Sequence, residues 1–142
     1  MRAGHRKRPA APRPSGIILI AEDQPDLRYL YATYFHLGNF RVETAVDGQQ
    51  AFEMAVDLRP DVIVLSLDLP RVDGWELTRR LKSDRRTGHI PVIACSGYTF
   101  GRSIDRALDA GCDAYVVKPC SLEELTKTVQ DVLARFEVRR GA

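Results

Sequence analysis

The sequence predicts an α/β fold in which a parallel five-stranded sheet lies between two layers of helices. Short apolar runs alternate five times with amphipathic stretches, and such continuous runs are typical of strands buried on both faces. The loops between these segments are short, which implies right-handed crossovers and helices on both sides of the sheet. With 142 residues, the chain has the length of one domain and can bury its own core.

In the first half of the chain, the element boundaries follow from proline, glycine and capping residues. Pro25 stands where the first turn of a helix tolerates a missing N–H, and Gly38 is expected to end that helix. Asp47 and Gln50 have the spacing of a capping box, and Pro60 stops the helix that follows. The expected elements are a strand over Ile17–Ala21, a helix from Pro25, a strand over Phe40–Ala45 and a helix over Ala51–Leu58.

In the second half, Val62–Leu67 is the most hydrophobic segment and is expected to form the central strand. Capping-box spacing recurs twice, at Asp73 with Glu76 and at Ser121 with Glu124. The remaining expected elements are a helix over Trp75–Lys82, a strand over Pro91–Ser96, a helix over Ser103–Ala110 that ends at Gly111, a strand over Ala114–Val117 and a last helix to about Phe136.

The positive charge of the chain is concentrated at its start. The formal net charge is +2, but residues 1–16 hold five of the 21 Lys and Arg residues and none of the 19 acids. This segment therefore carries +5 and the rest of the chain −3. We expect a disordered, proline-rich basic tail over 1–16, one domain over 17–138 and a short tail over 139–142. The first tail is either a solvated leader or an arm that touches acidic surfaces or nucleic acid, and the acidic body does not favour nucleic acid as a partner.

Hydropathy and cysteine usage indicate a cytoplasmic protein. The longest apolar runs are far shorter than the roughly 20 residues needed to span a bilayer, and no apolar segment of a secretory signal follows the basic start. Cys95, Cys112 and Cys120 are odd in number and lack CxxC spacing, so reduced thiols are expected. For Cys95, in a buried strand, we expect a packing role.

Polar side chains follow four of the five expected strands. Glu22 and Asp23 follow the first strand, and Ser66, Ser96 and Lys118 lie at the ends of the third, fourth and fifth. In open parallel sheets, ligand sites lie beyond the carboxyl ends of the strands, where the strand order reverses. A flavodoxin-like order, 2-1-3-4-5, would bring these side chains to one pocket.

The segments around these residues resemble the CheY-like receiver domain of bacterial two-component response regulators. The resemblance covers Ile17 to about Phe136 and rests on ILIAEDQPDLR, PDVIVLSLDLPRVDGWEL, PVIACSGYT and DAGCDAYVVKPC together. It implies phosphorelay signalling, in which a histidine kinase or phosphotransfer protein and a downstream target protein are the partners. It also implies a monomer or a dimer through the face of the fourth helix, fifth strand and fifth helix, with no membrane partner.

The resemblance implies a role for each matched residue. In the family, acids hold Mg²⁺, a hydroxyl residue and a Lys bind the phosphoryl group, and an aromatic residue reports the active state. These donors suit a hard cation and a tetrahedral anion. The matched residues are Asp23 and, through water, Glu22 for the metal, the Asp68 backbone carbonyl for the same metal, Ser96 and Lys118 for the phosphoryl group, and Tyr115 with Ser96 for the switch. Pro119, after Lys118, is expected to be cis.

The sequence departs from the family at the phosphoacceptor. Counting four residues back from Pro70 leads to Ser66, where the family has Asp, and the nearest acid is Asp68. A serine hydroxyl is a weak nucleophile without a base, and the missing carboxylate should weaken Mg²⁺ binding. We therefore expect an atypical receiver that signals through protein contacts without ordinary Asp phosphorylation and that is at most a self-phosphorylating protein, not an enzyme.

Two alternatives to this expectation stay open. In the first, Asp68 or Ser66 accepts a phosphoryl group in an Mg²⁺-dependent reaction. In the second, the match is shifted in register, although the segments PDVIVLS and LPRVDG flank Ser66 without a gap.

Overall fold

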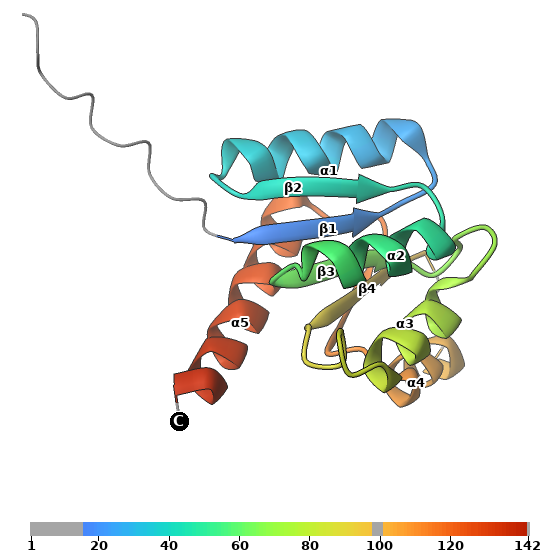
Figure 1. Cartoon of the computed structure of the whole chain (residues 1–142). Helices are drawn as coiled ribbons and strands as arrows, with labels where there is room; N and C mark the ends of the chain where they lie inside the picture. Colours follow the sequence, from blue (N-terminus) through green and yellow to red (C-terminus); the bar gives the residue numbers. More distant parts are fainter. Residues whose placement is uncertain (1–15, 98–100, 142) are drawn as a thin grey trace, which may run out of the picture.

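A parallel sheet of five strands forms the centre of the computed structural model, which describes residues 16–97 and 101–141 (Figure 1). The order is β2-β1-β3-β4-β5, which confirms the prediction. The elements are β1 (Ile17–Ala21), α1 (Pro25–Leu37), β2 (Arg41–Ala45), α2 (Gly48–Leu58), β3 (Val62–Ser66), α3 (Gly74–Ser83), β4 (Val92–Ser96), α4 (Gly101–Ala110), β5 (Ala114–Val117) and α5 (Leu122–Gly141).

The strand order reverses at β1, which pairs with β2 on one side and with β3 on the other. Ile20 of β1 lies opposite Thr44 of β2 and Val64 of β3 in the parallel register. After β1 the chain crosses to β2, and after β2 it returns past β1 to β3. The carboxyl ends of β1 and β3 therefore border a crevice that no crossover helix covers.

Alternate residues of the strands contribute to two separate cores. Leu19 and Ile63 pack with buried residues of α2, α3 and α4, such as Leu77. Ile18 and Val64 face the opposite way and pack with α1 and α5. The three inner strands β1, β3 and β4 are thus buried on both faces, which explains why they read as continuous apolar runs in the sequence, whereas the edge strand β2 is largely only partly buried.

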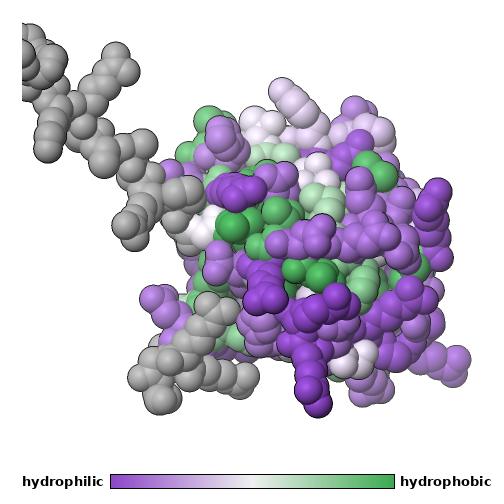
Figure 2. Space-filling model, in the orientation of Figure 1, coloured by the Kyte–Doolittle hydropathy of each residue, from purple (hydrophilic) through white to green (hydrophobic). Residues whose placement is uncertain are grey.

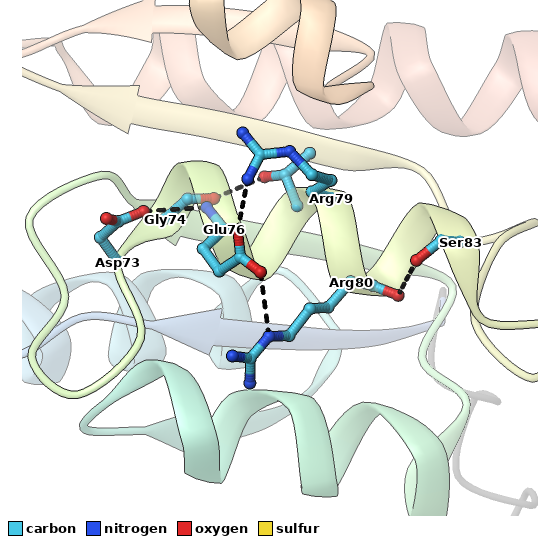
Figure 3. Close-up of polar contacts among 7 residues, drawn as sticks. Asp73, Gly74, Glu76, Arg79, Arg80 and Ser83 are labelled. Carbon is cyan, nitrogen blue, oxygen red and sulfur yellow. Dashed lines mark hydrogen bonds and ion pairs between the residues drawn. The ribbon is translucent and has the colours of Figure 1, made fainter.

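The side chains of Asp47, Asp73 and Ser121 cap α2, α3 and α5 as the sequence predicts, but the Glu76 carboxylate of the predicted capping box at α3 bonds elsewhere. Asp47 Oδ1 accepts a hydrogen bond from the Gln50 amide at 2.7 Å, and Asp73 Oδ1 accepts one from the Glu76 amide at 2.8 Å. The Glu76 carboxylate instead accepts hydrogen bonds from Arg79 and Arg80, one turn further along α3 (Figure 3). Two ion pairs on the exposed helix face replace one bond to the backbone of the cap.

The left-handed residue after α1 and the length of α5 differ from the sequence prediction. Helix α1 ends before Gly38, as predicted, but Gly38 has φ −80° and the left-handed residue is Asn39, with φ 70°. Asparagine tolerates this conformation better than other side-chain-bearing residues because its short amide bonds locally. Helix α5 continues past Phe136 to Gly141, since no proline or glycine interrupts the chain before that residue.

The surface is mostly hydrophilic on the face shown in Figure 2, with hydrophobic residues in small separate patches. Helix α1 carries three strongly exposed apolar side chains, Tyr29, Leu30 and Leu37. Within residues 16–97 and 101–141, no helix is both long and apolar enough to cross a membrane. The basic tail falls almost wholly outside the described residues.

Candidate functional site

Three of the expected site residues meet at the carboxyl end of the sheet. Lys118, directly after β5, donates a hydrogen bond from Nζ to Glu22 Oε1 at 2.5 Å. The same Nζ lies 3.5 Å from the Oγ of Ser66, the last residue of β3. The lysine thus spans the crevice between β5 and β1 and passes over the end of β3. The parallel strand order accounts for this meeting of residues that lie far apart in the sequence.

Hydrogen bonds to both its side chain and its backbone fix the position of the buried Glu22. Its side chain is only 3% exposed, and its second carboxylate oxygen accepts a hydrogen bond from the Gln24 amide at 3.2 Å. Its backbone amide donates to Ala45 O of β2, and Arg28 Nη1 donates to its carbonyl at 2.9 Å. A buried carboxylate needs such partners because its desolvation is costly. The role of Arg28 was missed from sequence, although it lies within the matched segment ILIAEDQPDLR.

The other two acids of the proposed site are exposed. Asp23 points to solvent, and among the described residues its carboxylate makes no ion pair with Lys118, while its carbonyl accepts a bond from Arg28 Nη1 at 3.3 Å. Asp68 is exposed in the turn after β3. Lys118 thus pairs with the buried acid of the Glu22–Asp23 pair, which the sequence alone did not distinguish from its neighbour.

Ser96 and Tyr115 form the part of the site next to α4. Ser96 is the last residue of β4, is 1% exposed, and its carbonyl accepts a hydrogen bond from the Lys118 amide at 2.7 Å. Burial raises the pKa of the half-buried Tyr115, while a hydrogen bond with the Ser96 side chain opposes this shift. The proposed switch residues therefore interact with each other, and Ser96 also bonds to the backbone of Lys118.

Two glycines, which sequence reasoning also missed, fix the loop after β3. A Cβ on Gly74 would lie 2.5 Å from the Ser66 carbonyl oxygen, and one on Gly48 would lie 1.9 Å from that of Val72. The Gly74 amide also donates to Leu67 O at 3.0 Å. At both glycines the helix backbone therefore packs directly against the backbone of this loop, which fixes the position of the end of β3.

The Lys118–Pro119 peptide bond is cis, as predicted.

The site offers a magnesium ion fewer carboxylates than the family resemblance implies. Mg²⁺ prefers carboxylate oxygens in near-octahedral geometry. Glu22 is paired with Lys118, and Ser66 offers a neutral hydroxyl where the family resemblance implies a carboxylate. In the described part of the chain, no group of three or more His, Cys, Asp or Glu residues is placed to hold a metal ion.

The comparisons with known proteins identify the family. Residues 18–130 match the family model described as "Response regulator receiver domain". The chain therefore belongs to the response regulator receiver family and acts in two-component signal transduction. Proteins of this family interact with histidine kinases and downstream effectors, and the receiver domain is generally not an enzyme in its own right.

Curated relatives include both a longer and a similarly short protein. The chain is 36% identical over 120 residues to the DNA-binding dual master transcriptional regulator RpaA of Synechocystis sp., and these residues are 84% of this chain but 50% of that protein. It is 30% identical over 116 residues to the polar-differentiation response regulator DivK of Brucella abortus, across 82% of this chain and 94% of that protein. The chain thus spans half of the first relative and nearly all of the second.

Solved structures agree on the fold. The chemotaxis response regulator CheY4 of Vibrio cholerae superposes with a TM-score of 0.78 at 26% identity, over 82% of this chain and 97% of that one. A sensor histidine kinase receiver domain from Pseudomonas aeruginosa gives a TM-score of 0.78 at 28% identity, over 84% of this chain and 98% of that one. The latter structure has a magnesium ion coordinated in its active site cleft.

Proposed function

We propose that this chain is an atypical receiver, which signals through protein contacts and does not take up a phosphoryl group on an Asp in the ordinary way. The observation that carries this proposal is the hydroxyl of Ser66 at the end of β3, beside a lysine that is already paired with Glu22. Ser66 stands where the family resemblance expects the acceptor carboxylate.

The surroundings of Ser66 support the proposal that its hydroxyl is a weak nucleophile. Serine attacks well only when a base accepts its proton. Helix α1 starts at the carboxyl end of β1, so His36 in its last turn lies at the opposite edge of the sheet, and His89 precedes β4 at that same edge. Lys118 Nζ donates hydrogen bonds and accepts none as an ammonium. Among residues 16–97 and 101–141, the Ser66 hydroxyl therefore has a cation beside it and no histidine.

The charge balance supports a fixed site more than a phosphoryl-transfer site. One ammonium faces one buried carboxylate at 2.5 Å, so the interior charges of the pocket already cancel. In an ordinary receiver the resemblance implies a third acid and a cation that balances it. The Lys118–Glu22 ion pair then connects the ends of β5 and β1 whether or not a partner protein is bound. The surface around it is thereby kept in one state for docking.

The proposed partners are a histidine kinase or phosphotransfer protein and a downstream target protein. The face of α4, β5 and α5 is the proposed contact for the target, or for a second copy if the chain is a dimer. Tyr115 lies on β5 in this face, and its bond with Ser96 links the face to the pocket. We place the protein in the cytoplasm because Cys95, Cys112 and Cys120 are all free thiols, which suits a reducing compartment.

A second candidate function is an Mg²⁺-dependent receiver that uses an unusual acceptor. The exposure of Asp68 favours it, because a phosphodonor can reach that carboxylate directly. Intact mass after incubation with Mg²⁺ and acetyl phosphate separates the two functions. The docking function predicts no added phosphoryl group. A stoichiometric phosphoryl group would contradict it, and peptide mapping would then identify Asp68 or Ser66 as the acceptor.

A further inference from the structure

Two cysteines and a tyrosine form a cluster below the site, on the α1–α5 face of the sheet. Cys95 belongs to β4, Tyr31 to α1, and Cys120 to the connection between β5 and α5. All three lie in the same core cluster, in which Tyr31 and Cys95 are buried and Cys120 is partly buried. Each thiol interacts with the Tyr31 hydroxyl, and the two thiols interact with each other.

The backbone explains why the two cysteines are neighbours. Val116 of β5 lies opposite Cys95 of β4 in the parallel register. Beyond β5, the Lys118 amide donates to Ser96 O at 2.7 Å, so the strands stay paired up to this point. Cys120 follows shortly after and points into the core cluster that contains Cys95. The end of β4 and the start of the α5 connection thus each contribute one thiol to the same place.

A cavity gives access to one of these thiols. It has a volume of about 300 Å³, lies between α1 and the start of α5, and is lined by Leu27, Leu30, Tyr31, Pro119 and Cys120 among others. Cys120 is partly exposed, whereas Cys95 is only 1% exposed. Burial also raises the pKa of Cys95 to about 12, so this thiol is protonated and slow to react directly. A reagent from solution therefore meets Cys120 first.

We propose that Cys95 and Cys120 are a redox-active pair, which a hydroperoxide converts into an intramolecular disulfide. The Cys120 sulfur attacks one peroxide oxygen as its thiol proton passes to the leaving oxygen, which breaks the O–O bond, gives a sulfenic acid at Cys120 and releases an alcohol or water. The Cys95 sulfur then attacks the sulfenic sulfur, loses its proton and forms the S–S bond, with release of water. Two thiols lose two electrons in total, and the hydroperoxide gains them.

This modification would act on the same segment as the site, because Cys120 and Lys118 share the short connection after β5. The disulfide would tie that connection to β4 next to Ser96, whose carbonyl already binds the Lys118 amide. It would also remove both thiol partners of Tyr31 and so alter the wall of the cavity. Oxidation is thus a second input to this end of the sheet, separate from phosphoryl chemistry.

The test is thiol counting on the reduced full-length protein before and after treatment with hydrogen peroxide at low protein concentration. We expect two of the three thiols to become resistant to alkylation, with a mass loss of two hydrogens that dithiothreitol reverses and a Cys95–Cys120 cross-linked peptide. Retention of all three thiols, oxidation of Cys120 alone, or a disulfide between two molecules would overturn the proposal.

Single variants separate the roles of the thiols. Cys112 lies in the core on the opposite face of the sheet, so Cys112→Ser should form the disulfide as the unchanged protein does. Cys95→Ala should instead accumulate a sulfenic acid at Cys120, which dimedone traps. Cys120→Ser should leave Cys95 unreactive in the folded protein. Rapid oxidation of Cys95 in the Cys120→Ser variant would contradict the assigned order of attack.

Discussion

Replacement of Lys118 by Met should destabilise the protein far more than the loss of an ordinary surface charge. The ammonium group is the partner of Glu22 at 2.5 Å, and the two side chains are 20% and 3% exposed. Removal of one member of a buried ion pair costs about 3–5 kcal/mol, because the other charge stays buried without its partner. Glu22 keeps its bond to the Gln24 amide, so we expect the lower end, about 3 kcal/mol.

Urea unfolding measures this cost, and a surface pair provides the control. Arg41 and Glu43 are 53% and 37% exposed and lie 3.3 Å apart, so Arg41→Met should cost less than about 1 kcal/mol. The double variant Glu22→Gln with Lys118→Met removes both charges and should recover part of the loss. The reasoning fails if Lys118→Met costs no more than Arg41→Met at an unchanged m-value.

Further predictions concern the scaffold. Asp47→Ala removes the cap on the Gln50 amide and should cost about 1 kcal/mol in urea unfolding. Gly48→Ala should destabilise the domain severely, because the added Cβ would lie 1.9 Å from the Val72 carbonyl oxygen. Thermal unfolding checks this prediction, and a Tm within a few degrees of that of the unchanged protein would argue against the contact. Hydrogen bonding to Arg86 lowers the pKa of Asp84 to about 2. Asp84 thus has a lower pKa in the folded than in the unfolded chain. The unchanged protein should therefore have a higher Tm than Asp84→Asn above about pH 4, and this difference should disappear as the pH falls towards 2. A difference that persists at pH 2 would refute this assignment.

Much of the fold was predictable because the two signals that specify it are local. Strands such as Val62–Ser66 are buried on both faces, so each is a short apolar run. Caps such as Asp47 have a fixed offset to the amide that they bind. The strand order then followed from the resemblance together with short right-handed crossovers, which leave few alternatives.

The contacts within the site were less predictable, because side-chain direction decides between neighbouring residues. Glu22 and Asp23 are adjacent acids, yet only Glu22 turns into the crevice towards Lys118. Glu76 has the capping-box spacing, but the two arginines on its own helix offer its carboxylate better partners than the backbone does. The contribution of Arg28 depends on a bend after β1 that brings two carbonyls within its reach. Such choices depend on tertiary geometry, which the spacing of residues does not encode.

The central claim is that the ordinary phosphoryl chemistry of the family is lost at Ser66, and a gain-of-function variant tests it most directly. Ser66→Asp would restore a carboxylate beside Lys118, and Ser66→Asn has the same shape without the charge. After incubation with Mg²⁺ and acetyl phosphate, we predict one added phosphoryl group by intact mass for Ser66→Asp, and none for Ser66→Asn or the unchanged protein. Phosphorylation of the unchanged protein, or none in Ser66→Asp, would contradict the account.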